Sequence, residues 1–267
     1  MRNRRRRVAA AVGAVVACAA LAGCFPVSPP PPPPGTFTGL GFDTCSAPTA
    51  QTMSDWLNSP YRAIGVYVGG EDAACLQPNL TASWVNTVAG MGWRLMPLYV
   101  GLQAPCTGIG AEFSWDPSQA GEQGRIDALN AIGRVNQLGL GPGTPIYFDM
   151  EAYDNSNAAC SAAVLSFLNS WDAWLQIYGY PAGVYSSAGS GITDLVHQVG
   201  NPYFHGPNSI WFAHWNYSPT VFGDPYIPDG YWNFHARIHQ YSGGHGEFYG
   251  GVWLDIDQDA VDAVLPA

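Results

Sequence analysis

Short apolar runs recur along the chain, and longer stretches between them repeat apolar residues every three or four positions. Apolar runs of four to seven residues bounded by turn residues are typical of buried β-strands. Stretches with the longer repeat are typical of amphipathic α-helices. The runs predict eight strands, at residues 40–43, 63–68, 94–100, 145–151, 182–186, 209–215, 236–241 and 252–257.

The longer stretches predict five helices, at residues 49–58, 81–91, 116–138, 158–178 and 192–199. The third begins at Asp116 and Pro117, an N-cap residue followed by proline at the first helical position. Residues 216–234 are rich in proline, tyrosine and tryptophan and are predicted to form a loop. Because strands that alternate with helices usually pair in parallel, the pattern predicts a mainly parallel sheet.

Residues 39–267 form one predicted domain, long enough for a large core. Eight strands in a chain of this length fit a compact α/β fold, a (β/α)8 barrel of the TIM type with some helices reduced. An open, doubly wound sheet is the alternative fold. The chain contains neither a Gly-x-Gly-x-x-Gly fingerprint nor a P-loop that would support this alternative.

The N-terminal residues before this domain indicate export. Residues 1–23 combine an arginine-rich start with a short apolar run, as signal peptides do. Residues 21–24 (Leu-Ala-Gly-Cys) resemble a bacterial lipobox, so we expect Cys24 to be lipidated; an ordinary secretory signal with a chance cysteine is the alternative. The lipidated cysteine and the rest of residues 24–38 form a proline-rich linker, a semi-rigid spacer between a membrane surface and the domain.

The expected location is therefore extracytoplasmic, either lipid-anchored on the outer face of the cell membrane or secreted. Five of the ten basic residues lie in the signal, so the remainder carries five arginines against 20 acidic residues and a net charge of −15. Such a domain is not expected to bind nucleic acid or anionic lipid, and its membrane contact is expected only through the anchor. We expect a monomer.

Four cysteines remain in the predicted domain: Cys45, Cys75, Cys106 and Cys160. An even number of cysteines in an exported chain, with no Cys-x-x-Cys spacing, favours two disulfides. Three pairings are possible. The simplest joins neighbours along the chain, Cys45 with Cys75 and Cys106 with Cys160.

Acidic side chains gather where predicted strands end. Asp149 and Glu151 end the strand at 145–151 and share one face of it, because side chains alternate along a strand. Asp43 ends the first predicted strand, and Asp255 and Asp257 end the last. In a closed barrel the first and last strands are neighbours and the fourth faces them, so the five acids are expected at one mouth. Carboxylate pairs of this kind perform glycoside hydrolysis; solvated acids at a barrel rim are the alternative.

Aromatic and amide side chains also lie near the predicted strand ends. Flat rings pack against the C–H faces of sugars, whereas amides and carboxylates bind sugar hydroxyl groups. The candidates for substrate binding are Tyr99, Tyr185, His214, Trp215, Gln240, Tyr241 and Asp257, and Tyr67 and Trp211 also qualify by position. The alternative is that about half of the aromatic residues belong to the core, because barrel strands are buried on both faces.

The motifs at these positions resemble, in their order and spacing, the family 25 glycoside hydrolases, which are lysozyme-type muramidases. They are Gly41-Phe42-Asp43, Asp149-Met150-Glu151, Trp211-x-Ala213-x-Trp215, Gln240-Tyr241-Ser242 and Asp255-x-Asp257. Over residues 39–262 the chain is still more similar to the glycoside hydrolase-like barrel domain of secreted actinobacterial proteins, catalogued as domain of unknown function 1906.

The resemblance implies a TIM-type barrel that acts on peptidoglycan or a related cell-wall glycan. It implies that Glu151 is the general acid and that Asp149 orients or stabilises. Asp43 and Asp255 then complete an acidic ring. Asp257 departs from the pattern, since the family 25 sequences have an amide there.

Two functional hypotheses follow from these residues. The first is a surface-anchored glycosidase of the cell envelope, and the second is a non-catalytic glycan-binding or envelope-organising lipoprotein. No cofactor is expected. A metal site is not expected either, because His235, His239 and His245 match no recognised zinc spacing. Asp255, Asp257 and Asp259 have the spacing of the first ligands of an EF-hand loop, but the glycine and glutamate that such a loop needs are missing.

Overall fold

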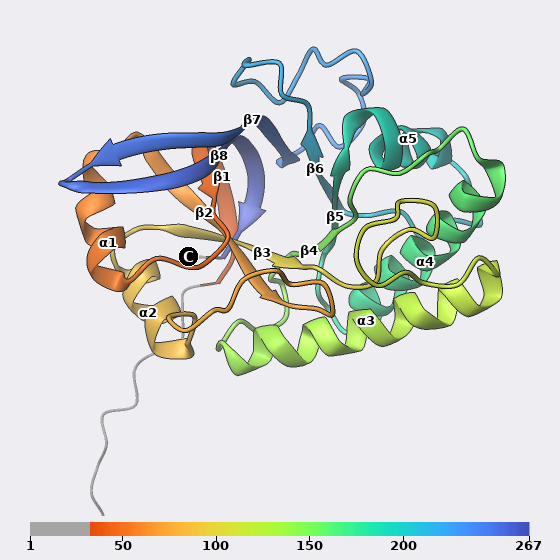
Figure 1. Ribbon diagram of the computed structural model, residues 1–267, viewed down its shortest axis with the longest axis horizontal. Helices are drawn as coiled ribbons and strands as arrows, with labels where there is room; N and C mark the ends of the chain where they lie inside the picture. The colour runs from red at the N-terminus through yellow and green to blue at the C-terminus, as the bar shows by residue number, and fades with distance from the viewer. Residues whose placement is uncertain (1–32, 267) are drawn as a thin grey trace, which may run out of the picture.

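The computed structural model describes residues 33–266, which contain eight strands that close into a barrel in chain order (Figure 1). The prediction of a TIM-type α/β barrel is confirmed, and every predicted strand has a counterpart. The strands are β1 (Gly35–Asp43), β2 (Tyr61–Gly69), β3 (Arg94–Tyr99), β4 (Ile146–Asp149), β5 (Ala182–Ser187), β6 (Ser209–Ala213), β7 (Ala236–Tyr249) and β8 (Val252–Leu265).

The last strand differs from the prediction. Strands β1 to β7 pair in parallel, but β8 runs antiparallel to both β7 and β1. The prediction of a short last strand that ends at Asp257 is therefore wrong in the length of the strand and in its direction. The reason is a tight turn at Gly250 and Gly251, whose φ angles of 57° and 89° suit a two-residue hairpin rather than a helical crossover.

The β7–β8 hairpin extends beyond the barrel and lies over α1 (Ala50–Asp55) in Figure 1. Its tip touches this helix, since a Cβ added to Gly250 would collide with the carbonyl oxygen of Asp55. One face of the hairpin is thus fixed to the body of the domain.

The helices cover the outside of the barrel, and four of them begin at a side chain that caps free backbone N–H groups. Thr49, Thr81, Asp116 and Asn157 each accept hydrogen bonds from the first turn of the following helix, which confirms the predicted start at Asp116. The remaining helices are α2 (Ala82–Gly90), α3 (Pro117–Gln137), α4 (Ala158–Ile177) and α5 (Thr193–Gln198), with short turns at η1 (Trp56–Asn58) and η2 (Ala188–Ile192).

The connection between β6 and β7 is a loop at residues 216–234, as predicted. Arg237 of β7 holds this loop in place. Its guanidinium is fully buried and donates hydrogen bonds to the carbonyl oxygens of Val221 (2.9 Å), Pro228 (2.6 Å) and Tyr231 (3.0 Å). These bonds satisfy a buried charge and hold the loop against the barrel rim.

Alternate residues of each strand face the barrel interior. Nine buried apolar side chains fill it: Ala63, Met96, Leu98, Tyr147, Trp211, Ile238, Val261, Ala263 and Leu265. The intervening residues face the helices, as Phe148 does against Phe167 and Trp171. Above the apolar plug, the next inward positions hold polar side chains such as Asp43 and Gln240. The core therefore ends where the mouth of the barrel begins.

Both predicted disulfides are present, Cys45–Cys75 and Cys106–Cys160. They join the loop after β1 to the loop after β2, and the loop after β3 to α4. Cross-links of this length restrict the unfolded chain and hold these loops around one end of the barrel. The predicted signal and Cys24 lie outside the described residues. Within residues 33–266, no helix has the length and apolar character that a bilayer crossing needs.

Candidate active site

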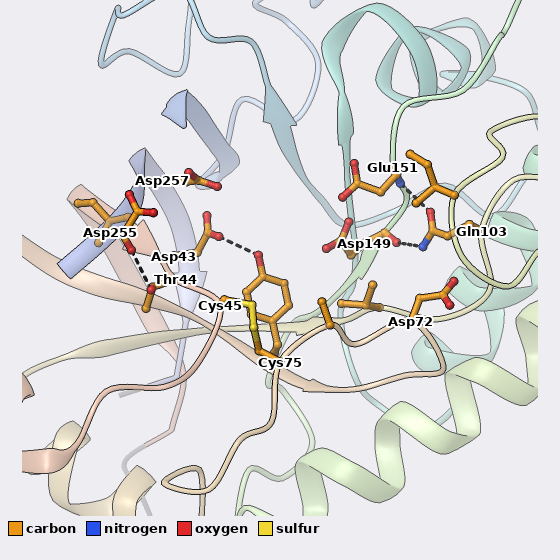
Figure 2. A pocket seen from close by; sticks show the side chains of 15 residues that line it. Asp43, Thr44, Cys45, Asp72, Cys75, Gln103, Asp149, Glu151, Asp255 and Asp257 are labelled. Atoms are coloured by element: carbon orange, nitrogen blue, oxygen red, sulfur yellow. Dashed lines mark hydrogen bonds between the residues drawn. A yellow bond between two sulfur atoms is a disulfide. The ribbon is translucent and has the colours of Figure 1, made fainter. Parts of the chain in front are cut away.

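A cavity of about 490 Å³ opens at the carboxyl ends of the first parallel strands, and all five predicted acids line it. Asp43, Asp255 and Asp257 stand on one side in Figure 2, and Asp149 and Glu151 on the other. The antiparallel β8 reaches the same mouth because its acids lie near its start. The other lining residues are Thr44, Cys45, Tyr67, Asp72, Ala74, Cys75, Val100, Gln103, Ile109 and Ile256.

Asp43 is the buried acid of the side formed by β1, β7 and β8. One carboxylate oxygen accepts a hydrogen bond from the Tyr67 hydroxyl (2.8 Å) and the other from Nε2 of Gln240 (2.9 Å). Burial and then the negative charge of Asp257 raise the pKa of Asp43 to about 7, although both hydrogen bonds lower it. Asp43 is thus a firmly held group that changes charge near neutral pH.

Asp257 lies directly opposite Asp43 in the pairing of β1 with β8. Its carboxylate accepts a hydrogen bond from the backbone N–H of Gly244 (2.6 Å). Burial and then Asp255 raise its pKa, and the Gly244 bond opposes them. Asp255 is exposed at the rim, where its backbone carbonyl, not its carboxylate, accepts from the Thr44 hydroxyl (2.9 Å).

Asp149 and Glu151 face these acids from the end of β4. Asp149 is almost fully buried, and its Oδ1 has no hydrogen-bond partner among the described residues. Burial, followed by the charges of Glu151 and Asp43, raises the pKa of Asp149 well above its usual value. Glu151 is half-buried, and burial raises its pKa too, with the backbone N–H of Ala152 opposing and Asp257 adding. Such carboxyl groups retain a proton at higher pH than free ones.

Gln103 fixes the backbone that carries these two acids. Its Nε2 donates to the carbonyl oxygen of Asp149 (2.9 Å), and its Oε1 accepts from the N–H of Glu151 (2.9 Å). The same amide also donates to the carbonyl oxygen of Gly101 (3.1 Å). A buried amide with its groups satisfied in this way holds the end of β4 in one conformation.

On the opposite side of the cavity, Gln240 is the amide that joins several side chains by hydrogen bonds, as Gln103 does for the backbone of β4. Besides donating to Asp43, it accepts at Oε1 from the Tyr185 hydroxyl (3.0 Å) and from Nε1 of Trp215 (3.0 Å). Trp215 is 58% exposed, and its ring lies across Gly243, where an added Cβ would collide with it. The structure therefore presents one face of a fixed indole ring beside the acids.

The model of the Rv2525c-like, glycoside hydrolase-like domain matches residues 54–261, well over half of the chain. The chain belongs to this family. A comparison with the curated proteins found no match.

The glycoside hydrolase-like domain also resembles solved structures. An uncharacterized protein from B. stearothermophilus matches with a TM-score of 0.51 at 16% identity, over 84% of this chain and 95% of that one. A family 25 glycosyl hydrolase from Bacillus anthracis matches with a TM-score of 0.49 at 17% identity, over 84% and 89% of the two chains. The Cpl-1 endolysin, solved with a peptidoglycan analogue, gives 0.47 and 16%, over 86% and 56%. At 16% identity, the match to the B. stearothermophilus protein shows the fold alone.

Of the seven predicted binding residues of this glycoside hydrolase-like domain, only Asp257 lines the cavity. Gln240 adjoins it through Asp43 and binds Tyr185 and Trp215.

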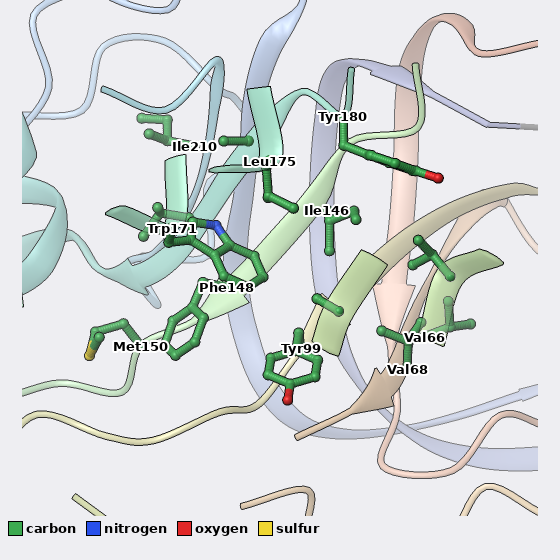
Figure 3. Packing of buried hydrophobic residues seen from close by; sticks show 14 of the residues in the cluster. Val66, Val68, Tyr99, Ile146, Phe148, Met150, Trp171, Leu175, Tyr180 and Ile210 are labelled. Carbon is green, nitrogen blue, oxygen red and sulfur yellow. The ribbon is translucent and has the colours of Figure 1, made fainter. Parts of the chain in front are cut away.

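The remaining three predicted binding residues lie farther from the cavity. Tyr99 faces the helices, where its ring packs on Phe148 and Trp171 (Figure 3). Tyr241 packs outside the barrel in a small cluster with Val221. Both follow an inward-facing residue by one position, so strand alternation directs them away from the mouth.

His214 is the third. Its Nδ1 is hydrogen-bonded to Asp224 (2.6 Å), and Tyr226 lies edge-on to the ring. Asp224 and Tyr226 both belong to the loop at 216–234. His214 is therefore a residue of the barrel rim, and its hydrogen bond to Asp224 holds the loop in place.

Gln103 and Asp259 were not among the predicted site residues. Gln103 lies in a loop without periodicity, so no sequence pattern singled it out. Asp259 continues the two-residue spacing of Asp255 and Asp257, and this spacing was a usable signal. It is fully buried beneath the cavity, accepts a hydrogen bond from Nε1 of Trp211 (2.8 Å), and burial raises its pKa well above the usual value.

The arrangement places carboxyl groups with raised pKa values on both walls of one cavity, and hydrogen bonds hold the Asp43 carboxyl group in position. Among residues 33–266, no group of three or more histidine, cysteine, aspartate or glutamate side chains is placed to hold a metal ion. The chemistry these residues offer is proton transfer and stabilisation of positive charge.

Proposed function

We propose that this protein is an exported, envelope-anchored glycoside hydrolase that acts on peptidoglycan or a related cell-wall glycan. The observation that carries the proposal is the pair Asp149 and Glu151 at the end of β4, which have raised pKa values and, within residues 33–266, no hydrogen bond from another side chain to their carboxyl groups. They face Asp43 and Asp257 across the cavity (Figure 2). Opposed carboxyl groups flanking a glycosidic bond are the usual apparatus of glycoside hydrolysis.

Glu151 is the proton donor in this proposal. It lies at the open end of the pair, whereas Asp149 lies deeper and is almost fully buried. The carboxylic acid of Glu151 protonates the glycosidic oxygen as the C–O bond breaks, so that the leaving sugar departs as an alcohol. Burial and the charge of Asp257 raise the pKa of Glu151, and Asp149 beside it orients the bound sugar.

The opposite wall stabilises the positive charge that develops on the sugar ring. Asp43 and Asp257 lie opposite each other in the register of β1 and β8, and the charge of Asp257 raises the pKa of Asp43, so the two do not ionise independently. Trp215 offers its exposed face to a neighbouring sugar ring. Water then completes hydrolysis at the ring carbon.

Hydrolysis is tested by the release of reducing ends from purified peptidoglycan. We expect wild-type protein to release them and Glu151→Gln to lose at least about 99% of the rate, since general acid catalysis contributes about 10²- to 10⁴-fold. Glu122→Gln is the matched control, because Glu122 lies exposed on α3. Equal rates for wild type and Glu151→Gln would exclude the assignment.

A non-catalytic glycan-binding or envelope-organising lipoprotein is the second candidate. It is favoured by the hydrogen bonds that already occupy both Asp43 oxygens, an arrangement that suits a rigid binding wall. Saturable binding of wall fragments without any new reducing ends would support this candidate over the first.

The extracellular location rests on the two disulfides, which oxidising compartments favour, and on the sequence before residue 33. We propose cleavage after residue 23, lipidation of Cys24 and a linker over residues 24–38. Incorporation of a labelled fatty acid that is abolished by Cys24→Ser would support the anchor, and unchanged labelling would contradict it.

A further inference from the structure

The free face of the β7–β8 hairpin carries two exposed aromatic side chains that the proposed reaction does not use. Phe248 and Trp253 lie directly opposite each other in the hairpin register and are 64% and 60% exposed. The other face is covered, since Tyr249 and Leu254 pack against the core beside Trp56. We call Phe248 and Trp253 the hairpin platform.

The hairpin platform lies in line with the acids of the cavity. Trp253, Asp255 and Asp257 alternate along β8 and therefore share one face of the strand. Asp255 and Asp257 line the cavity. At about 3.4 Å per residue, Trp253 stands roughly 7 Å beyond Asp255 along the strand. A polymer that leaves the cavity along β8 therefore passes Asp255 and reaches the platform.

The Trp253 ring lies across the backbone of β7. Gly246 pairs with Asp255, and a Cβ added to Gly246 would come within 2.8 Å of the indole ring. Trp215 lies across Gly243 in the same manner. Each ring thus has backbone behind it and one face free. The C–H face of a pyranose ring packs against a surface of this kind.

We propose that the hairpin platform is a second sugar-binding site, which holds a pyranose unit of an extended glycan strand while another part of the strand occupies the cavity. The inference rests on the proposed function in taking the cavity ligand to be a glycan. The strand is neutral rather than polyanionic, because Asp255 is exposed beside the platform and the chain outside the signal carries a net charge of −15.

The test compares long and short ligands by calorimetry in a Glu151→Gln background, which keeps the ligand intact. The probes are the hexasaccharide and the disaccharide of β-1,4-linked N-acetylglucosamine. We expect Trp253→Ala to weaken hexasaccharide binding about tenfold, the value of one good aromatic contact, and to change disaccharide binding less than about twofold. Gly246→Val, which displaces the ring without removing it, is expected to act in the same direction.

Phe234→Ala is the matched control, because Phe234 is 86% exposed and precedes β7 at the opposite end of the barrel. It is expected to leave both affinities unchanged. Equal losses for both ligands, an unchanged hexasaccharide affinity, or no hexasaccharide binding by the parent protein would overturn the proposal. A dimer that Trp253→Ala converts to monomer would also overturn it, since a second copy would then cover the platform.

Failure of the proposed function is measured separately. If wild-type protein binds the hexasaccharide through Trp253 but releases no reducing ends from it, the site stands and the hydrolase assignment fails. If reducing ends appear but Trp253→Ala leaves hexasaccharide affinity unchanged, the hydrolase stands and the site fails.

Discussion

The two walls of the acidic cavity carry similar side chains but are built differently. On the hairpin side, Asp43 is held at both oxygens and Asp257 is held by a backbone N–H. On the β4 side, Gln103 fixes the backbone, while neither Asp149 nor Glu151 receives a hydrogen bond from another described side chain. One wall immobilises the carboxyl groups themselves, and the other immobilises only the chain that carries them.

This difference separates two tasks that sequence spacing alone does not distinguish. A carboxyl group already bound by donors is held in position and, once ionised, as Asp43 is above about pH 7, is suited to stabilising a cation. A carboxyl group on a rigid backbone with free oxygens can give its proton to a ligand. We propose from this difference that β4 carries proton transfer and the hairpin side carries charge stabilisation.

The largest effect is expected on the β4 wall. Asp149→Asn should reduce kcat by about 10²-fold or more, because an amide can neither exchange a proton with the ligand nor develop a negative charge beside the sugar. Asp255→Asn should change kcat less than about threefold, since Asp255 is an exposed rim residue whose carboxylate is solvated. Reducing-end assays measure both, and similar losses for the two variants would remove the distinction between the walls.

The amide that holds β4 gives the next largest effect. Gln103→Leu leaves the Asp149 carbonyl and the Glu151 N–H without partners, so we expect kcat to fall about tenfold to a hundredfold and stability to fall by about 1–3 kcal/mol. Gln176→Leu is the control, because Gln176 tethers Gly206 on a remote loop. If both variants lose stability but Gln103→Leu keeps its kcat, then Gln103 stabilises the fold and does not position the acids for catalysis.

Substitution of Trp215, on the hairpin side, is expected to have a smaller effect on catalysis. Trp215→Ala should raise KM about tenfold with kcat changed less than about threefold, because it removes a stacking surface and not a reacting group. Trp215→Phe should recover part of the affinity. An unchanged KM for Trp215→Ala would show that no sugar rests on this ring.

The smallest effect is a dependence of stability on pH. The Asp43 carboxyl binds its proton more tightly in the folded chain, with a pKa raised from 3.8 to about 7. The unfolded chain therefore releases that proton at lower pH, and stability falls as pH rises from about 4 through about 7. We expect the melting temperature to follow this slope, and Asp43→Asn to make it shallower. An identical slope in the variant would contradict the raised pKa.

The sequence predicted the barrel, its strand order and the acids at its mouth, because apolar periodicity and strand-end chemistry are local signals. Strand alternation was also available, and it excludes Tyr99 and Tyr241 from the mouth. Each stands one residue after an inward side chain, Leu98 or Gln240. A position near the end of a strand was therefore not enough to identify a residue of the site. The alternation of side chains between the two faces of the strand had to be applied as well.

Other features depend on contacts between distant residues. The direction of β8 is set by the turn at Gly250 and Gly251, and its acids reach the predicted mouth from the start of the strand. Gln103 acts on residues 46 and 48 positions away through hydrogen bonds from an irregular loop. No periodic pattern encodes such a contact, so only the folded chain reveals it.

The division of tasks between the two walls is tested most directly by a crystal structure of Glu151→Gln with the bound N-acetylglucosamine hexasaccharide. We expect a glycosidic oxygen within about 2.6–3.2 Å of the residue 151 side chain, and Asp43 and Asp257 on the opposite side of the sugar. A sugar whose glycosidic oxygen instead meets Asp43 or Asp257, with the end of β4 unoccupied, would contradict the division of tasks between the two walls.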